Sequence, residues 1–326
     1  MKAVWYERRG PAREVLTYGD HPTPKPGRNE VLIRVHASGV NPSDAGARRG
    51  PGPMQYPKVI GNSDGAGIVE ECGPNVAQDM LGKRVWFYNG QRNGRAFGSG
   101  AEYIELDVDL VRVLPDSVSF AEGATLGIPC MTAHRAVFAG GAVQGRTVLV
   151  TGGAGAVGHY CVQWAKWAGA TVIATVSSPE KAERARAGGA DFTIDYKTED
   201  VRARIREITE GEGVHHVADI DLGGNAADTF ASLRVNGSIA YYANRGGGDG
   251  VKLGPMSQKN LTLTGIYLPQ VPHEARQRAQ DDITHWLRTG KRILSVASTH
   301  PLARAYEAHE AVERGDKIGT VVVISA

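Results

Sequence analysis

Glycines at a phosphate-binding spacing occupy the middle of the chain. Gly153, Gly155 and Gly158 follow an apolar β-branched run in RTVLVTGGAGAVGHYCVQWAKWAGA, residues 146–170. In the pattern G-x-G-x-x-G, the first glycine allows a turn that a side chain would block. The second lets a pyrophosphate approach the backbone, and the third lets a helix pack tightly on a strand. The helix-period segment after the turn would direct its N-terminal N–H groups at the phosphates. We therefore predict a dinucleotide site, with a phosphate-binding or purely structural turn as the alternative, formed by Gly153, Ala154, Gly155, Ala156, Val157 and Gly158.

The residues after the next β-branched run indicate which dinucleotide is bound. An NAD-selective site places Asp or Glu at the end of the second strand, about 20 residues past the glycine motif. Here ATVIATV, residues 170–176, is followed by Ser177 and Ser178. Hydroxyls can donate to the 2′-phosphate of NADPH, and Lys181, one turn into the next helix, can pair with it. We predict a preference for NADPH; in the alternative, Lys181 only solvates a helix surface beside neighbouring glutamates.

The elements that position these residues alternate between strand and helix. Strands separated by helices of about 10 to 15 residues are typical of βαβ units and a parallel sheet. After the glycine motif we predict helices at 179–190, 200–210 and 225–235 and strands at 191–196, 214–224 and 237–243, with 260–268 closing the sheet at an edge.

The flanking regions have a different pattern. Short strand-like runs separated by Pro- and Gly-rich turns, from MKAVWYE to AEYIELDVDLVRVLP (101–115), indicate a β-rich domain that forms a partly open barrel. Near Ser119 the chain becomes helical, with Ser119 as N-cap and Glu122 completing a capping box. The tail holds predicted helices at 273–290 and 303–315, and its last strand, KIGTVVVIS, is expected to return to the first domain.

The composition indicates a globular protein without a polyanionic partner. A length of 326 residues suggests two domains. The net charge is +2 with charges interspersed, so nucleic-acid binding is not indicated. Cys72, Cys130 and Cys161 are too widely separated for a disulfide framework or a C-x-x-C metal site. No apolar run approaches the roughly 18 residues of a membrane-spanning helix, and the charged N-terminus lacks a signal-peptide core, so we expect a cytoplasmic protein with no membrane partner.

Several motifs in order resemble a known family. GVNPSDAGARRG (39–50), YPKVIGNSDGAGIVEECG (56–73), GSGAEYIEL (98–106), ATLGIPCMTAHRAV (124–137) and VLVTGGAGAVG (148–158) are similar to the zinc-independent quinone oxidoreductases related to zeta-crystallin, in the medium-chain dehydrogenase/reductase superfamily. The resemblance implies an α/β fold: a Rossmann doubly wound parallel sheet plus a GroES-like partly open barrel. We expect the β-rich domain at 1–120, the dinucleotide-binding domain at 121–262 and a return segment at 263–326. The resemblance also implies a homodimer whose subunits pair through the edge of the nucleotide-binding sheet.

The resemblance further indicates that no metal is bound. Zinc-dependent relatives place a cysteine, a histidine with an adjacent glutamate, and a second cysteine around a catalytic zinc. At the matching positions this chain has Asn41, then Asn62 with Ser63, and Ile128. Amides and an isoleucine are poor zinc ligands, so we predict that the catalytic metal is absent. The lobe near residues 90–100, which holds a structural zinc in such relatives, has no cysteine.

Without a metal, an electron-poor acceptor is the plausible substrate. Oxidising an ordinary alcohol relies on a metal to stabilise the developing alkoxide. A quinone or an α,β-unsaturated ketone needs mainly a positioned nicotinamide and a hydrogen bond to the developing oxyanion. We predict Asn41 near nicotinamide and substrate, or alternatively a turn-stabilising role before Pro42. Asp44 is either a pocket polar group or a surface turn residue.

The remaining site residues are expected from the resemblance. Thr132 matches the threonine beside the nicotinamide, with a helix threonine bonded to its own backbone as the alternative. Gly46 stands where many relatives carry a pocket tyrosine and possible proton donor, so that role is open. Tyr56, Tyr88 and Tyr267 are candidates to line the pocket instead, with ordinary core or rim residues as the alternative. The residues also expected to bind NADPH are Tyr196, Asn244 and Lys317.

Three functions follow as hypotheses. The first is an NADPH-dependent quinone reductase. The second is an NADPH-dependent reductase of conjugated double bonds in enones or alkenals. The third, from another class, is a low-turnover NADPH-binding protein with a structural or RNA-binding role. The near-neutral charge counts against RNA binding.

Overall fold

The computed structural model describes residues 1–243, 247, 251–315 and 317–325. The chain divides into two compact units, Met1–Pro129 with Gln280–Ala326, and Cys130–Ala279. These limits lie later than the predicted ones at 120 and 262. At the first limit, α3 (Phe120–Gly123) packs against strands of the first unit, and the backbone N–H of Ile128 donates to Asp64 there. At the second, the division falls inside α10 (His273–Thr289) rather than directly after the last strand of the parallel sheet.

The first unit is β-rich, as predicted. Seven strands form one sheet in the order β15-β16-β3-β5-β6-β8, with β7 also pairing with β3, and a smaller sheet has the order β2-β1-β4. The strands are β1 (Lys2–Tyr6), β2 (Thr17–Asp20), β3 (Glu30–Val40), β4 (Val59–Ile60), β5 (Asp64–Cys72), β6 (Arg84–Phe87), β7 (Tyr103–Asp107), β8 (Val111–Val113), β15 (Val296–Pro301) and β16 (Thr320–Ile324). The other helices of this unit are α1 (Ala12–Val15), α2 (Pro42–Arg49) and α11 (Ala305–Arg314).

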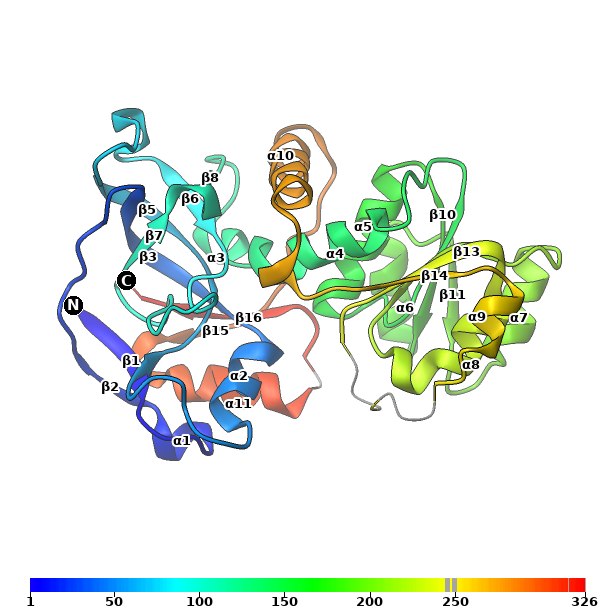
Figure 1. Cartoon of the computed structure of the whole chain (residues 1–326), viewed down its shortest axis with the longest axis horizontal. Helices are drawn as coiled ribbons and strands as arrows, with labels where there is room; N and C mark the ends of the chain where they lie inside the picture. The colour runs from blue at the N-terminus through cyan, green and yellow to red at the C-terminus, as the bar shows by residue number, and fades with distance from the viewer. Residues whose placement is uncertain (244–246, 248–250, 316, 326) are drawn as a thin grey trace. The chain divides into compact units, whose positions relative to one another are not determined.

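The long strand β3 organises this unit. Its alternating sequence EVLIRVHASGV buries Val31, Ile33 and Val35 in an apolar core shared with β5, β6 and β7. The returning strand β16 pairs antiparallel with β3, with Val321 opposite Val40. Figure 1 shows red β16 beside blue β3, so the last strand of the chain joins the main sheet of the first unit, which confirms the predicted return.

The second unit is a parallel six-stranded sheet in the order β11-β10-β9-β12-β13-β14. Numbered within the sheet, this order is 3-2-1-4-5-6, the doubly wound arrangement that binds dinucleotides where the order reverses, here between β9 and β12. The strands are β9 (Thr147–Val150), β10 (Thr171–Val176), β11 (Phe192–Asp195), β12 (Val214–Asp219), β13 (Leu233–Tyr241) and β14 (Thr262–Gly265). The helices are α4 (Met131–Phe138), α5 (Ala156–Trp167), α6 (Pro179–Ala187), α7 (Val201–Ile208), α8 (Leu222–Ser232) and α9 (Gly254–Gln258).

Two local features differ from the sequence expectation. No helix was predicted at α2, which begins at Pro42; proline suits the first helical turn because it lacks the N–H that would be unpaired there. Helix α8 begins at Leu222, three residues before the predicted start, and gives way to β13 at Leu233. In the part of the chain that the structure describes, no helix has the length and apolar character needed to cross a bilayer.

Candidate functional site

The glycine motif forms the predicted tight turn between β9 and α5. The left-handed residue of this turn is Gly152, with φ +66°, rather than Gly153. Gly153 is required for packing instead, because a Cβ there would lie 2.6 Å from the Ala174 Cβ on β10. A Cβ on Gly158 would lie 2.2 Å from the Gly152 carbonyl oxygen, so the third glycine lets α5 approach the turn. The N-terminal N–H groups of α5 begin directly after Gly155, where an anion is favoured.

Buried hydrogen bonds fix the turn on the sheet. The Thr151 hydroxyl donates to Asp219 Oδ1 at 3.0 Å and accepts from the Ile220 N–H at 2.9 Å. Gly152 N–H donates to Thr175 Oγ1 at 3.1 Å. These bonds tie together the carboxyl ends of β9, β10 and β12, the edge at which a doubly wound sheet binds its ligand.

The end of β10 carries hydroxyls and an ammonium group. Ser178 caps α6 by accepting from the Lys181 backbone N–H at 3.3 Å, and Lys181 Nζ donates to Ser177 Oγ at 3.0 Å. Tyr196 follows the neighbouring strand β11, donates its N–H to the Val176 carbonyl at 3.1 Å and is 53% exposed. The four polar side chains predicted to meet the 2′-phosphate therefore lie at or just after two adjacent strand ends.

The other residues expected to bind cofactor are distributed differently. Thr132 is buried in the first turn of α4. Lys317 belongs to the first unit and donates its Nζ to the Gly319 carbonyl at 3.1 Å. Asn244 lies outside the described residues.

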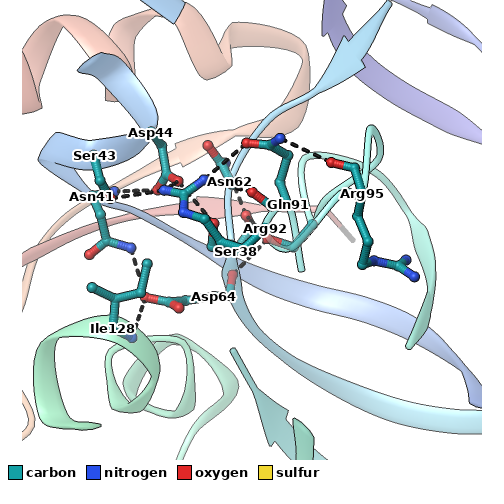
Figure 2. Close-up of polar contacts among 12 residues, drawn as sticks. Ser38, Asn41, Ser43, Asp44, Asn62, Asp64, Gln91, Arg92, Arg95 and Ile128 are labelled. Carbon is teal, nitrogen blue, oxygen red and sulfur yellow. Dashed lines mark hydrogen bonds and ion pairs between the residues drawn. The ribbon is translucent and has the colours of Figure 1, made fainter. Parts of the chain in front are cut away.

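In the first unit, Asn41 is joined to a buried carboxyl group. Its Nδ2 donates to Asp64 Oδ2 at 2.7 Å, and the backbone N–H of Ile128 donates to the same oxygen at 2.8 Å (Figure 2). Asp64 thus contacts two of the three positions compared with zinc ligands. The sequence reasoning named Asn62 and Ser63 and missed Asp64, although it is the only acid in the apolar first half of β5, DGAGIV.

Asp44 lies on the other side of Asn41. Its Oδ2 accepts from the Asn41 backbone N–H at 2.8 Å, and its Oδ1 accepts from Ser63 Oγ at 3.1 Å and from Arg92 Nη2 at 2.8 Å. Arg92 also donates to Ser43 Oγ at 2.9 Å. The Asp44 and Arg92 side chains are 1% and 9% exposed, so this is a buried ion pair at the start of α2.

Asn62 belongs to a second series of hydrogen bonds between buried polar side chains. Its Nδ2 donates to Ser38 Oγ at 3.0 Å, and its Oδ1 lies 3.2 Å from His309 Nε2. Ser38 contacts the Ser99 hydroxyl, which donates to the Asp64 carbonyl at 2.7 Å. Burial lowers the pKa of His309 to about 4, so this imidazole is neutral near pH 7.

The pKa of Asp64 is raised, whereas that of His309 is lowered. Burial is the main cause and the neighbouring Asp44 charge adds to it, while the Asn41 and Ile128 donors and Arg92 oppose them. Together these raise the pKa of the Asp64 carboxyl to about 8. Asp64 is therefore largely protonated near neutral pH.

The surroundings of the cluster also bear on the remaining expectations. A Cβ built on Gly46 would meet no described atom within 4 Å, so the position of the family tyrosine is open space. Of the alternative tyrosines, Tyr56 donates to the Gly94 carbonyl, Tyr88 is buried and Tyr267 is 61% exposed. No group of three His, Cys, Asp or Glu side chains arranged to hold a metal ion is found among the described residues.

Comparison with known proteins identifies the family. Residues 27–116 match the alcohol dehydrogenase GroES-like domain and residues 156–284 the zinc-binding dehydrogenase family. A quinone oxidoreductase from Pseudomonas aeruginosa is 32% identical over 318 residues, covering 95% of this chain and 96% of the relative. The chain belongs to the quinone oxidoreductase family of the medium-chain dehydrogenases/reductases.

Two further proteins of known identity are similar to this chain over nearly its whole length. A 2-haloacrylate reductase from a Burkholderia species is 32% identical over 344 residues and covers 99% of this chain and 98% of the relative. The crystal structure of Escherichia coli quinone oxidoreductase complexed with NADPH superposes with a TM-score of 0.86 at 27% identity, covering all of both chains. The family assignment and the predicted α/β fold are thus confirmed.

Proposed function

We propose that the protein is an NADPH-dependent oxidoreductase that reduces quinones without a catalytic metal. The observation that carries this proposal is the polar cluster at Asn41, which has an amide at a position compared with a zinc ligand and carboxyls and a guanidinium bonded around it. Amide and guanidinium donors suit an electron-poor carbonyl that needs only a hydrogen bond as it accepts charge. The similarity to the Pseudomonas aeruginosa quinone oxidoreductase supports the same acceptor class.

The second unit fits the proposed cofactor. Gly153 and Gly158 in this turn leave no room for a Cβ, and α5 begins here with its free backbone N–H groups. Ser177 and Lys181 provide donors at the end of β10, where an NAD-selective site would place a carboxylate. NADPH, when bound, supplies a hydride from C4 of its nicotinamide ring. We propose that Ser177, Ser178, Lys181 and Tyr196 bind its 2′-phosphate and that Thr132 contacts the ring.

In the first unit, Asn41 is proposed to bind the carbonyl oxygen of the acceptor. One Nδ2 proton is engaged by Asp64, which leaves the other Nδ2 proton to donate to a developing oxyanion. Asp44 holds the Asn41 backbone, and Arg92 neutralises Asp44, so the amide is fixed before substrate arrives. Since Gly46 offers no hydroxyl, we propose that the final proton reaches the product from solvent.

A second candidate acceptor is the double bond of an enone or alkenal. The relative named 2-haloacrylate reductase, as similar as the quinone oxidoreductase, favours it. Both reactions place negative charge on a carbonyl oxygen, so the same cluster serves either.

The test is a panel assay. NADPH and NADH oxidation are followed by absorbance against quinones, enones and alkenals, with products identified. Turnover of quinones with NADPH preferred supports the proposal. Faster turnover of enones supports the second candidate, and binding of NADPH without turnover of any acceptor would refute both.

We also propose a cytoplasmic homodimer paired through β14. This edge strand would otherwise leave backbone groups unpaired, and edges of that kind are usually covered. Light scattering at twice the chain mass is expected, and a monomer mass in dilute solution would contradict it.

A further inference from the structure

The two acids beside Asn41 share one cation. Asn41 bridges them, with its backbone N–H on Asp44 and its side chain on Asp64 (Figure 2). Of the two acids, Arg92 bonds to Asp44, and among the described residues no cation bonds to Asp64. His309, on α11, reaches Asn62 and is neutral. Two carboxylate charges at this depth with one guanidinium are unfavourable, so one acid is expected to retain its proton.

The hydrogen bonds identify which acid that is. Asp64 Oδ2 accepts from both Asn41 and Ile128, whereas Oδ1 is buried and has no hydrogen-bond partner in the described parts of the chain. A Cβ on Gly127 would lie 2.2 Å from Oδ1, so this oxygen lies directly against the Gly127 backbone. Asp44, in contrast, has three donors including Arg92. The charge belongs on Asp44 and the proton on Asp64.

The same bonds fix the orientation of Asn41. The Ile128 N–H can only donate, so Asp64 Oδ2 accepts from it, and when Oδ2 carries no proton the Asn41 amino group must be the group that faces this oxygen. This holds for the ionised carboxylate and for the neutral acid with its proton on Oδ1. What changes on ionisation is the charge: a carboxylate 2.7 Å from Asn41 Nδ2 would oppose negative charge developing on a group bound to the same amide.

We infer that Asp64 is a positioning residue that holds the Asn41 amide as a neutral acid and lowers the rate of reduction when it ionises. This inference rests on the proposed role of Asn41 in the reductase reaction. Asp64→Asn preserves the acceptor for Asn41 and Ile128 and mimics the neutral acid, whereas Asp64→Ala removes the acceptor.

The kinetic test compares kcat and KM of the wild type and both variants from about pH 6 to about pH 10. The wild type is expected to lose kcat as the pH rises through about 8. Asp64→Asn should keep kcat within about threefold at low pH and lose this alkaline limb, while Asp64→Ala should lower kcat about tenfold with NADPH KM unchanged. Asp116→Asn removes an exposed carboxyl, 98% accessible, and controls for net charge. An unchanged alkaline limb in Asp64→Asn would overturn the inference.

A second measurement does not depend on turnover. Isotope-edited infrared spectroscopy of aspartate-labelled protein without substrate should detect a protonated carboxyl near about pH 6 that disappears above about pH 9 and is missing in Asp64→Asn. If the wild type reduces no acceptor, the proposed function fails while this band still decides the protonation of Asp64. Absence of the band from the wild type at low pH would refute the inference by itself.

Discussion

The buried acid Asp64 predicts a pH-dependent stability difference. In the unfolded chain an aspartate titrates near pH 3.9, whereas burial and Asp44 raise the pKa of folded Asp64 to about 8. Between these values the folded state holds a proton that the unfolded state has released. The contribution of Asp64 to stability is therefore complete below about pH 4 and is lost as the pH rises toward 8, by about 1.4 kcal/mol per pH unit.

Asp64→Asn removes this titration and keeps the shape of the side chain. The free energy of unfolding of the variant relative to wild type should rise steadily from about pH 5 to about pH 8 and then level off. A pKa shift of about 4 units corresponds to about 6 kcal/mol for the whole change, and this is an upper limit because partial relaxation around a buried charge reduces it.

Urea unfolding of both proteins at several pH values, analysed with a common m value, measures this difference. The control is Asp116→Asn, which makes the same Asp-to-Asn replacement at an exposed position and should show no such trend. A difference between wild type and Asp64→Asn that stays constant from about pH 5 to about pH 8 would show that Asp64 is ionised in the folded protein, and the charge argument would be wrong.

Three other outcomes are expected. Lys181→Ala removes the ammonium at Ser177 and should raise the NADPH KM about 10- to 100-fold with little change for NADH; equal use of both cofactors by the wild type would contradict this. Gly158→Ala places a Cβ 2.2 Å from a backbone oxygen and should abolish NADPH binding or folding, whereas Gly155→Ala, whose nearest contact is 3.3 Å, should be milder by calorimetry and thermal melting. Activity should survive chelation, because Asn41 and Ile128 are not zinc ligands; elemental analysis finding about one tightly bound zinc per chain would refute it.

The second unit followed closely from the sequence because its signals are local. The strands β9 and β10 are β-branched runs, and the helices α6 and α7 begin at the side-chain caps Ser178 and Asp200. Helices alternate with these strands along the chain. In the first unit, the predicted capping box at Ser119 is present. The Glu122 N–H donates to Ser119 Oγ at 3.3 Å, and the Glu122 carboxylate accepts from the Ser119 N–H. Helix α2 was missed because Pro42 and Gly46 lie within eight residues, and such residues usually indicate a turn.

The candidate site followed only partly, because its contacts span long distances in the chain. Asn41 and Asp44 lie three residues apart and were predicted together. Asp64 is 23 residues from Asn41, and Arg92 is 48 residues from Asp44. Neither partner belongs to a local pattern, so only the pairing of β3 with β5 and the position of the loop after β6 bring them to the cluster.

The pairing of β16 with β3 also constrains the order in which the protein can be completed. During synthesis β3 emerges early, but its edge at Ala37–Val40 has no partner until β16 has been made. The whole second unit, Cys130–Ala279, lies between them in the chain and can complete its own sheet first. An exposed strand edge of this kind readily pairs with other chains. A nascent chain arrested before residue 320 would thus carry a finished nucleotide-binding unit beside an aggregation-prone sheet.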